Sequence, residues 1–139
     1  DCTLLFLDND TQNPTSTASI TPDKLDEIGF SANFLSDNVV LVGTKEFEDI
    51  YPDNFLVDMV NLKFPRDDGN DWSVAEIQQL KRDSPKFSED LRVLVSKEHK
   101  KRVGKPEIAL EFANFLPVEE VPNLAKIKVL FDKVDTMIK

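Results

Sequence analysis

The chain has 139 residues, of which 40% are hydrophobic and 31% are charged, with a formal net charge of −9 and a single cysteine, Cys2. This composition is typical of one globular domain in a reducing, cytoplasmic compartment, and it excludes a disordered tail, an internal disulfide and an apolar run long enough to span a membrane. The acidic balance argues against a general nucleic-acid-binding surface. It does not exclude a metal-dependent nuclease, because the carboxylates that bind metal are themselves acidic.

The first predicted element is a buried strand over residues 3–7, an unbroken apolar run that ends abruptly in Asp8 and Asp10. On a regular strand these two side chains point to the same face. Ligands and catalytic groups gather at the carboxyl edge of α/β sheets, and carboxylate oxygens are the ligands that Mg²⁺ prefers. An ordinary Asp/Asn-rich turn after a strand remains the alternative. Because a buried strand opens the chain without an initiator Met, we expect further sequence upstream.

A second strand is predicted over residues 38–43, after a polar loop over 11–19 and a short helix that starts at Thr21. The pattern of the first strand repeats here, because Glu46 and Glu48 follow the apolar run. Two strand ends with acids could together hold two cations for an in-line phosphoryl displacement. The alternative is that these acids are simply favoured at a helix N-terminus by the helix dipole. Asp49 is a weaker metal candidate, since it could cap the following helix instead.

The remainder of the chain is predicted to be helical. Apolar residues recur at helical spacing, and Ser73 with Glu76 forms a capping box. The predicted helices lie between Pro52 and Pro65, over 73–82, over 87–98, from 104 to about 116, and over 123–137. The fold class is therefore α/β, with a partial parallel sheet of two or three strands followed by a mostly helical second half. Residues 1–64 form the α/β part with the acidic motifs, and residues 65–139 form the helical part of the same domain.

Two basic features could contact phosphate. Lys105 stands just before a Pro-started helix, where backbone N–H groups and the helix dipole attract anions, and it could neutralise charge on a scissile phosphate. An exposed lysine without a role is the alternative. The chain has one basic cluster, which could contact a nucleic-acid backbone. Its members are Lys97, Lys100, Lys101 and Arg102. A solvated helix end explains this cluster equally well, since cations are also favoured at helix C-termini.

Three segments, in this order, resemble the TOPRIM nuclease domain of the OLD (overcoming lysogenization defect) family of endonucleases. Leu-Leu-Phe-Leu-Asp-Asn-Asp at 4–10 looks like the TOPRIM strand that ends in DxD. Val-Leu-Val-Gly-Thr-Lys-Glu-Phe-Glu-Asp at 40–49 is similar to the acidic motif after the following strand. Gly-Lys-Pro-Glu-Ile-Ala at 104–109 is similar to the segment that supplies a late basic residue near the active site. The resemblance covers nearly the whole chain and identifies it with the C-terminal part of such a domain.

The resemblance implies a DNA endonuclease with a TOPRIM-like fold and a two-metal mechanism, fused to an upstream ATPase module and acting in DNA processing or anti-phage defence. It implies that Mg²⁺ or Mn²⁺ is held by the following acids: Asp8, Asp10, Glu46 and Glu48. It implies catalytic roles for Glu46 and Lys105, and it leaves open a homodimer of the full-length protein. One departure matters: the glutamate motif that opens TOPRIM domains does not precede Asp1. We therefore expect that half of the site to come from upstream sequence or from another chain.

The alternatives come from different functional classes. A non-catalytic protein-interaction domain would carry the acids as surface features and would not bind metal. A ligase-like or primase-like phosphotransferase would share the fold, whereas a topoisomerase would need a nucleophilic tyrosine, for which Tyr51 is poorly placed. A receiver-type phosphoacceptor domain fits badly, because strands and helices do not alternate in the second half.

Overall fold

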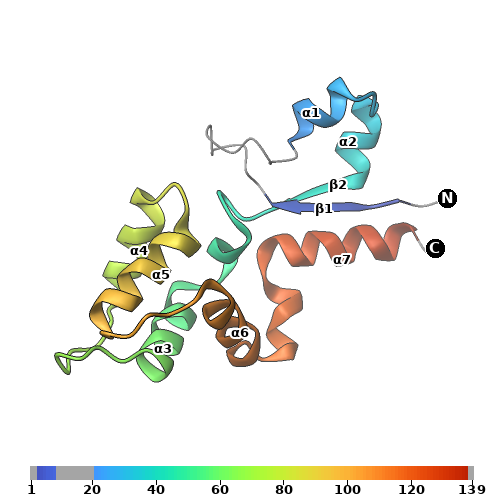
Figure 1. Ribbon diagram of the computed structural model, residues 1–139. Helices are drawn as coiled ribbons and strands as arrows, with labels where there is room; N and C mark the ends of the chain where they lie inside the picture. The colour runs from blue at the N-terminus through green and yellow to red at the C-terminus, as the bar shows by residue number, and fades with distance from the viewer. Residues whose placement is uncertain (1–2, 9–20, 138–139) are drawn as a thin grey trace. The chain divides into compact units, whose positions relative to one another are not determined.

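The structure is a computed structural model that describes residues 3–8 and 21–137 (Figure 1). It confirms a mixed α/β fold, with a small two-stranded parallel sheet and seven α-helices within those residues. The elements are β1 (Leu5–Asp8), α1 (Pro22–Glu27), α2 (Ala32–Asn38), β2 (Val39–Val42), the 3₁₀ helix η2 (Phe47–Ile50), α3 (Asp53–Lys63), α4 (Val74–Asp83), α5 (Phe87–Glu98), α6 (Lys105–Phe115), the 3₁₀ helix η3 (Val118–Asn123) and α7 (Ala125–Met137).

The helix starts follow the signals in the sequence. The Thr21 hydroxyl accepts a hydrogen bond from the Lys24 N–H at 3.3 Å, so it caps α1. The Ser73–Glu76 capping box is confirmed, because Ser73 Oγ accepts from the Glu76 N–H at 3.3 Å and Glu76 Oε2 accepts from the Ser73 N–H at 2.9 Å. Helix α2 was not predicted. Its start is capped by Ser31, whose hydroxyl accepts from the Phe34 N–H at 3.2 Å.

The chain divides into two compact units. Unit 1 comprises Asp1–Ile50 and Val121–Lys139, and unit 2 comprises Tyr51–Glu120. Compactness alone does not decide whether two units fold as one domain. The expectation of a single domain that changes from α/β to helical at residue 64 therefore stays a prediction.

Unit 1 is built on the parallel pair β1–β2 (Figure 1). Leu5 is opposite Val39 and Asp8 is opposite Val42, so the carboxyl ends of the two strands lie at the same edge of the sheet. Val40 and Val42 are buried, at 4% and 0% exposure. Parallel strands need a crossover connection, and here α1 and α2 lie in the segment that joins β1 to β2.

Helix α7 packs on β2 and returns the end of the chain to the sheet. Leu124 and Ile127 are buried at the start of this segment. Further along α7, the Lys133 ammonium donates hydrogen bonds to the carbonyl oxygens of Ser36 and Asp37 at 3.0 and 2.6 Å. These carbonyls belong to the last turn of α2, where backbone acceptors lack partners within the helix. Lys133 therefore ties α7 to the helix that precedes β2.

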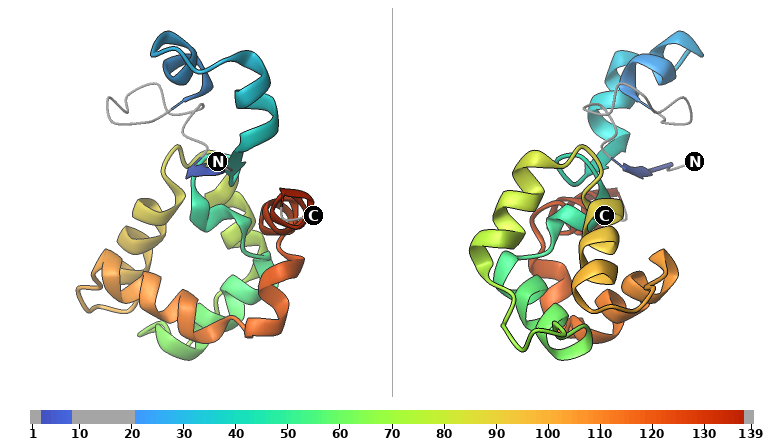
Figure 2. Two further views of the ribbon diagram at one scale, coloured as in Figure 1. Left: turned by 90° about the vertical axis from the view of Figure 1, so that its right-hand side faces the viewer. Right: turned by 60° about the vertical axis from the view of Figure 1, so that its left-hand side comes forward.

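Unit 2 consists of α3, α4, α5 and α6, in which each helix contacts the next and α6 also contacts α3 (Figure 2). Apolar side chains that recur at helical spacing are buried in this unit. The fully or almost fully buried members are Leu56, Met59, Val60, Ile77, Phe87, Leu91, Val95, Ile108 and Phe112. Tyr51, just before α3, stacks against Phe112 with ring centroids 5.0 Å apart.

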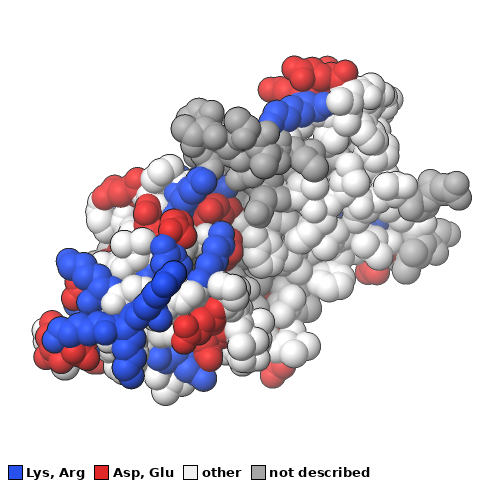
Figure 3. All heavy atoms as spheres, in the orientation of Figure 1, with Lys and Arg blue, Asp and Glu red and all other residues white. Residues whose placement is uncertain are grey.

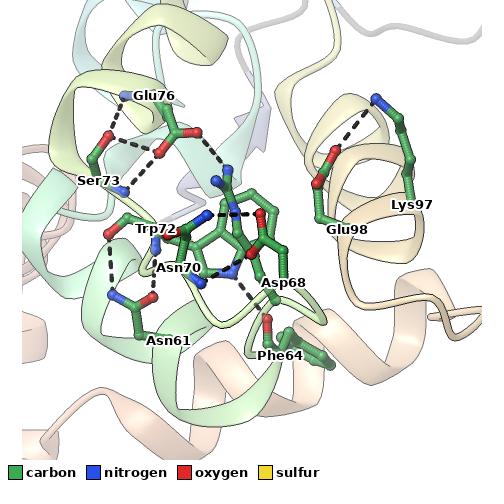
Figure 4. A network of polar contacts seen from close by, with 10 residues as sticks. Asn61, Phe64, Asp68, Asn70, Trp72, Ser73, Glu76, Lys97 and Glu98 are labelled. Carbon is green, nitrogen blue, oxygen red and sulfur yellow. Dashed lines mark hydrogen bonds and ion pairs between the residues drawn. The ribbon is translucent and has the colours of Figure 1, made fainter.

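Trp72 fastens the loop between α3 and α4 (Figure 4). It is 2% exposed, and its indole N–H donates to the Phe64 carbonyl oxygen at 2.9 Å. The Asn61 side chain pairs with both backbone groups of Trp72, accepting from its N–H at 2.7 Å and donating to its C=O at 3.1 Å. The Arg66 guanidinium lies 4.1 Å from the centre of the indole ring and forms an ion pair with Glu76. Trp72 thus packs this Asp-rich loop onto the body of unit 2.

Candidate functional site

The carboxyl edge of the β1–β2 sheet is the place to which the sequence assigned the acids. Because Asp8 pairs with Val42, the backbone of β1 ends beside the residue that precedes the turn at Gly43. The side chain of Asp8 and the whole of Asp10 lie outside the described part of the chain. The structure thus brings the two strand ends together, and it places the backbone of one predicted ligand, Asp8, at that edge.

Glu46 and Glu48 lie in the loop and the 3₁₀ helix that directly follow β2, and both are half-buried. Between them, Phe47 packs edge-on against Phe6 of β1, with ring centroids 6.3 Å apart and an interplanar angle of 79°. Phe6 precedes Asp8 by two residues on the same strand. The aromatic contact therefore holds the loop with both glutamates against β1, close in sequence to Asp8.

Gly43 forms the turn that leads into this loop. It is buried and has a φ of +76°, a backbone conformation that residues with a side chain rarely adopt. A Cβ atom at this position would lie 1.8 Å from the Glu46 carbonyl oxygen, far inside van der Waals contact. Only glycine allows the chain to fold back on itself so closely at this point.

Asp49 closes the loop from its other end. Its Oδ1 accepts a hydrogen bond from the Thr44 N–H at 2.7 Å, and its Oδ2 accepts from the N–H groups of Lys45 and Glu46 at 2.7 and 3.1 Å. Both oxygens of the carboxylate therefore bind backbone. The sequence allowed Asp49 to cap the following helix, but the structure differs: the carboxylate binds the loop that precedes it.

The oxygen ligands predicted at this edge fit a hard divalent cation by their chemistry. Over the described stretches 3–8 and 21–137, no group of three or more His, Cys, Asp or Glu side chains is arranged to hold a metal ion. Two of the four predicted ligands are not covered by this statement: only the backbone of Asp8 is described, and Asp10 lies outside the described residues. Of the four predicted metal ligands, the structure therefore describes the side chains of Glu46 and Glu48 alone.

Lys105 lies in unit 2, at the first position of α6, and is exposed. Its charge acts on Glu89 together with those of Arg92 and Lys86, and the pKa of Glu89 lies below its usual value. The main cause is the pair of hydrogen bonds that the Arg92 side chain donates to this carboxylate. Lys105 thus acts on the same carboxylate as Lys86 and Arg92, a connection that sequence spacing did not reveal, because they precede Lys105 by 19 and 13 residues. Lys105 and the acids belong to different units, so its role beside them stays a prediction.

The predicted basic cluster begins at the end of α5. Lys97 forms an ion pair with Glu98 at 3.3 Å, and Lys100 forms one with Asp67 at 2.9 Å. The pairing with Asp67 raises the pKa of Lys100. Lys101 and Arg102 are exposed, and neither forms an ion pair with a carboxylate in the part of the chain that the structure describes. The last two residues of the cluster are thus the ones available to an external anion.

Basic side chains concentrate on unit 2, although the whole chain is acidic. Nine of the 17 Lys and Arg residues lie between residues 81 and 105, together with only four of the 26 Asp and Glu residues. In Figure 3 the Lys and Arg side chains gather over the region of α4 and α5. Acidic side chains lie among them, and within the described residues four of the nine basic residues form ion pairs with carboxylates. These four are Lys81, Arg92, Lys97 and Lys100.

Comparison of the chain with protein-family models, curated proteins and solved structures finds no significant match. Within the described residues, none of the helices has the length and apolar character needed to cross a membrane.

Proposed function

We propose that this chain is the C-terminal part of a TOPRIM-like nuclease domain in a metal-dependent DNA endonuclease of the OLD family. The observation that carries the proposal is the parallel pairing of β1 with β2, which sets Asp8 opposite Val42, four residues before Glu46. This arrangement is the one that the resemblance implies for the DxD strand and the acidic motif after the next strand. Carboxylates at neighbouring strand ends are also what a two-metal hydrolase needs.

In the proposed reaction the four acids Asp8, Asp10, Glu46 and Glu48 hold Mg²⁺ or Mn²⁺ through carboxylate oxygens. A cation held by these residues would supply Lewis-acid chemistry, by making a bound water more acidic and by neutralising charge on the phosphodiester. Glu46 orients the attacking water, and Lys105 neutralises charge on the scissile phosphate. The half-buried positions of Glu46 and Glu48 suit this role, because partial burial strengthens electrostatic interactions with a cation.

Calorimetric titration of the full-length protein with Mg²⁺ or Mn²⁺, with plasmid nicking assayed in parallel, tests the proposal. The wild-type protein is expected to bind the metal and to nick DNA. The double variant Asp8→Asn, Asp10→Asn is expected to lose both activities, since each substitution removes a charged ligand. The double variant Asp23→Asn, Asp26→Asn removes the same charge from helix α1 and serves as the matched control. A full-length wild-type protein that neither binds metal nor nicks DNA would support a non-catalytic interaction domain instead.

DNA binding by unit 2 can be tested without metal. In EDTA, replacing Lys101 and Arg102 with Gln is expected to weaken binding to a labelled DNA duplex by about 10-fold at roughly 0.1 M salt. The slope of log K against log salt is expected to become shallower by about 2, since two phosphate contacts are lost. Fluorescence anisotropy across a salt series measures both quantities.

The matched control for this experiment replaces Lys24 and Lys128 in unit 1 with Gln, which changes the net charge equally. If both double variants weaken DNA binding to the same extent, the effect comes from net charge, and the assignment of the contact to Lys101 and Arg102 is wrong.

A further inference from the structure

Asp49 is surrounded by backbone donors from the loop that it follows. The three N–H groups that it binds are consecutive, at Thr44, Lys45 and Glu46, and the donor–acceptor distances are 2.7, 2.7 and 3.1 Å. In addition, the Asp49 N–H donates to the Glu46 carbonyl oxygen at 3.3 Å. Hydrogen bonds from backbone N–H groups to an ionised carboxylate are among the stronger ones in proteins. The loop is thus bound to Asp49 in two ways, through the side-chain carboxylate and through the backbone N–H of this residue.

The surrounding packing leaves this loop little freedom. At its start, the Glu46 carbonyl group lies so close to the Cα atom of Gly43 that a side chain at this position would clash with it. In its middle, Phe47 is held by the edge-on contact with Phe6 of β1. Without Asp49, three neighbouring N–H groups would lose their acceptor, although the turn at Gly43 would still hold them close together. The conformation of residues 43–49 therefore depends on the Asp49 carboxylate.

We propose that Asp49 is a positioning residue, which fixes Glu46 and Glu48 at the end of β2 in the conformation that binds the divalent cation. This inference rests on the nuclease function proposed above. Its carboxylate is placed to hold the loop, because it accepts three backbone hydrogen bonds from the residues that lead to Glu46 and Glu48. Residues that hold metal ligands in place typically contribute a factor of about 10 to 100 in metal affinity when they are replaced.

The test compares Asp49→Ala and Asp49→Asn with wild type in the full-length protein, by Mn²⁺ titration calorimetry and by amide hydrogen exchange of Thr44, Lys45 and Glu46. Asp49→Ala is expected to bind Mn²⁺ about 10- to 100-fold more weakly and to lose exchange protection at these amides. Asp49→Asn keeps one carbonyl oxygen that can accept from the N–H groups of Lys45 and Glu46, but its NH2 group then faces the Thr44 N–H. It is therefore expected to lose protection at Thr44, to keep it at the other two amides and to bind Mn²⁺ up to about 10-fold more weakly than wild type.

Two controls separate positioning from ligation and from general damage. Glu48→Gln removes a proposed ligand and is expected to abolish Mn²⁺ binding while leaving the amide protection intact. Asp68→Ala removes a carboxylate that accepts a hydrogen bond from the Asn70 backbone N–H in unit 2. This contact is of the same kind as those of Asp49, but it does not involve the loop with the proposed ligands. It is expected to bind Mn²⁺ as wild type does.

The outcomes are distinct. Wild-type affinity in Asp49→Ala would overturn the positioning role while leaving the proposed function standing. Loss of binding in Asp49→Asn with full amide protection would also overturn it, since that result makes Asp49 a ligand. If wild type binds no Mn²⁺, the proposed function fails and the positioning role fails with it. If Asp49→Ala does not fold, Asp49→Asn decides through Thr44: loss of exchange protection at this amide with weaker Mn²⁺ binding supports the positioning role, and the same loss with unchanged Mn²⁺ affinity overturns it.

Discussion

Replacing Gly43 with Ala is expected to destabilise unit 1 by about 3 kcal/mol or more. The added Cβ atom would lie 1.8 Å from the carbonyl oxygen and 2.5 Å from the carbonyl carbon of Glu46, and both belong to the backbone. The clash cannot be relieved by a side-chain rotation, so the main chain of residues 43–46 has to move. That movement breaks the hydrogen bonds to Asp49, and the positive φ adds further strain. Urea unfolding followed by far-UV circular dichroism measures the loss.

Gly29 provides the matched control in the same unit. It also has a positive φ, of +99°, but a Cβ atom there would meet nothing within 4 Å. Gly29→Ala is therefore expected to cost only the backbone strain, about 1 to 2 kcal/mol. If the two alanine variants lose equal stability, the close approach of Glu46 to Gly43 contributes nothing, and the account of this turn is wrong. In the full-length protein, the Gly43 variant should also lose Mn²⁺ binding, whereas the Gly29 variant should keep it.

The second large effect is expected at Trp72. Trp72→Ala should destabilise unit 2 by about 3 to 5 kcal/mol, because it empties the space of a buried indole. It also removes the hydrogen bond to the Phe64 carbonyl and the ring on which the Arg66 guanidinium lies. Far-UV circular dichroism has to follow the unfolding, since Trp72 is the sole tryptophan and its fluorescence is lost in the variant.

Two further variants separate the contributions at this position. Trp72→Phe keeps most of the apolar volume but leaves the Phe64 carbonyl without its indole donor, so a loss of about 1 to 3 kcal/mol is expected. Val118→Ala truncates a side chain that is 81% exposed in the same unit, and it should change stability by less than about 0.5 kcal/mol. A Trp72→Ala loss close to that of Val118→Ala would contradict the structural role given to the indole.

Much of the fold could be read from local patterns. The apolar runs of β1 and β2, the capping box at Ser73 and the Pro-started helices carry signals that lie within a few residues of the element they define. Helix α2 has one such signal, the N-cap Ser31, but its own composition is unfavourable. Its seven residues, Ala-Asn-Phe-Leu-Ser-Asp-Asn, include four polar residues of weak helix propensity, and tertiary packing beside β2 and α1 supports it. Sequence reasoning could not see that support, because it comes from neighbours in space.

The candidate site, like the fold, could be predicted from the sequence only in part. The order of the elements sufficed to place Asp8 and Glu46 after neighbouring strands. The polar partners were not predictable, because they depend on how the chain turns. Asp49 was recognised as able to cap a helix, but the three N–H groups it binds lie before it in the loop. The pairing of Lys100 with Asp67 joins residues 33 positions apart, so the sequence could not show that part of the basic cluster is already neutralised.

Unit 1 is discontinuous in sequence, and this affects the order in which the protein can fold during translation. Its strands belong to the first 50 residues, whereas α7, which packs on β2, begins at Ala125. The segment Tyr51–Glu120 that lies between them is a compact unit whose helices contact one another. During translation, unit 2 can therefore form these helix contacts first, while the nascent sheet lacks its covering helix until α7 has been made. A ribosome that stalls before residue 125 would thus leave the strands that carry the acids without their covering helix.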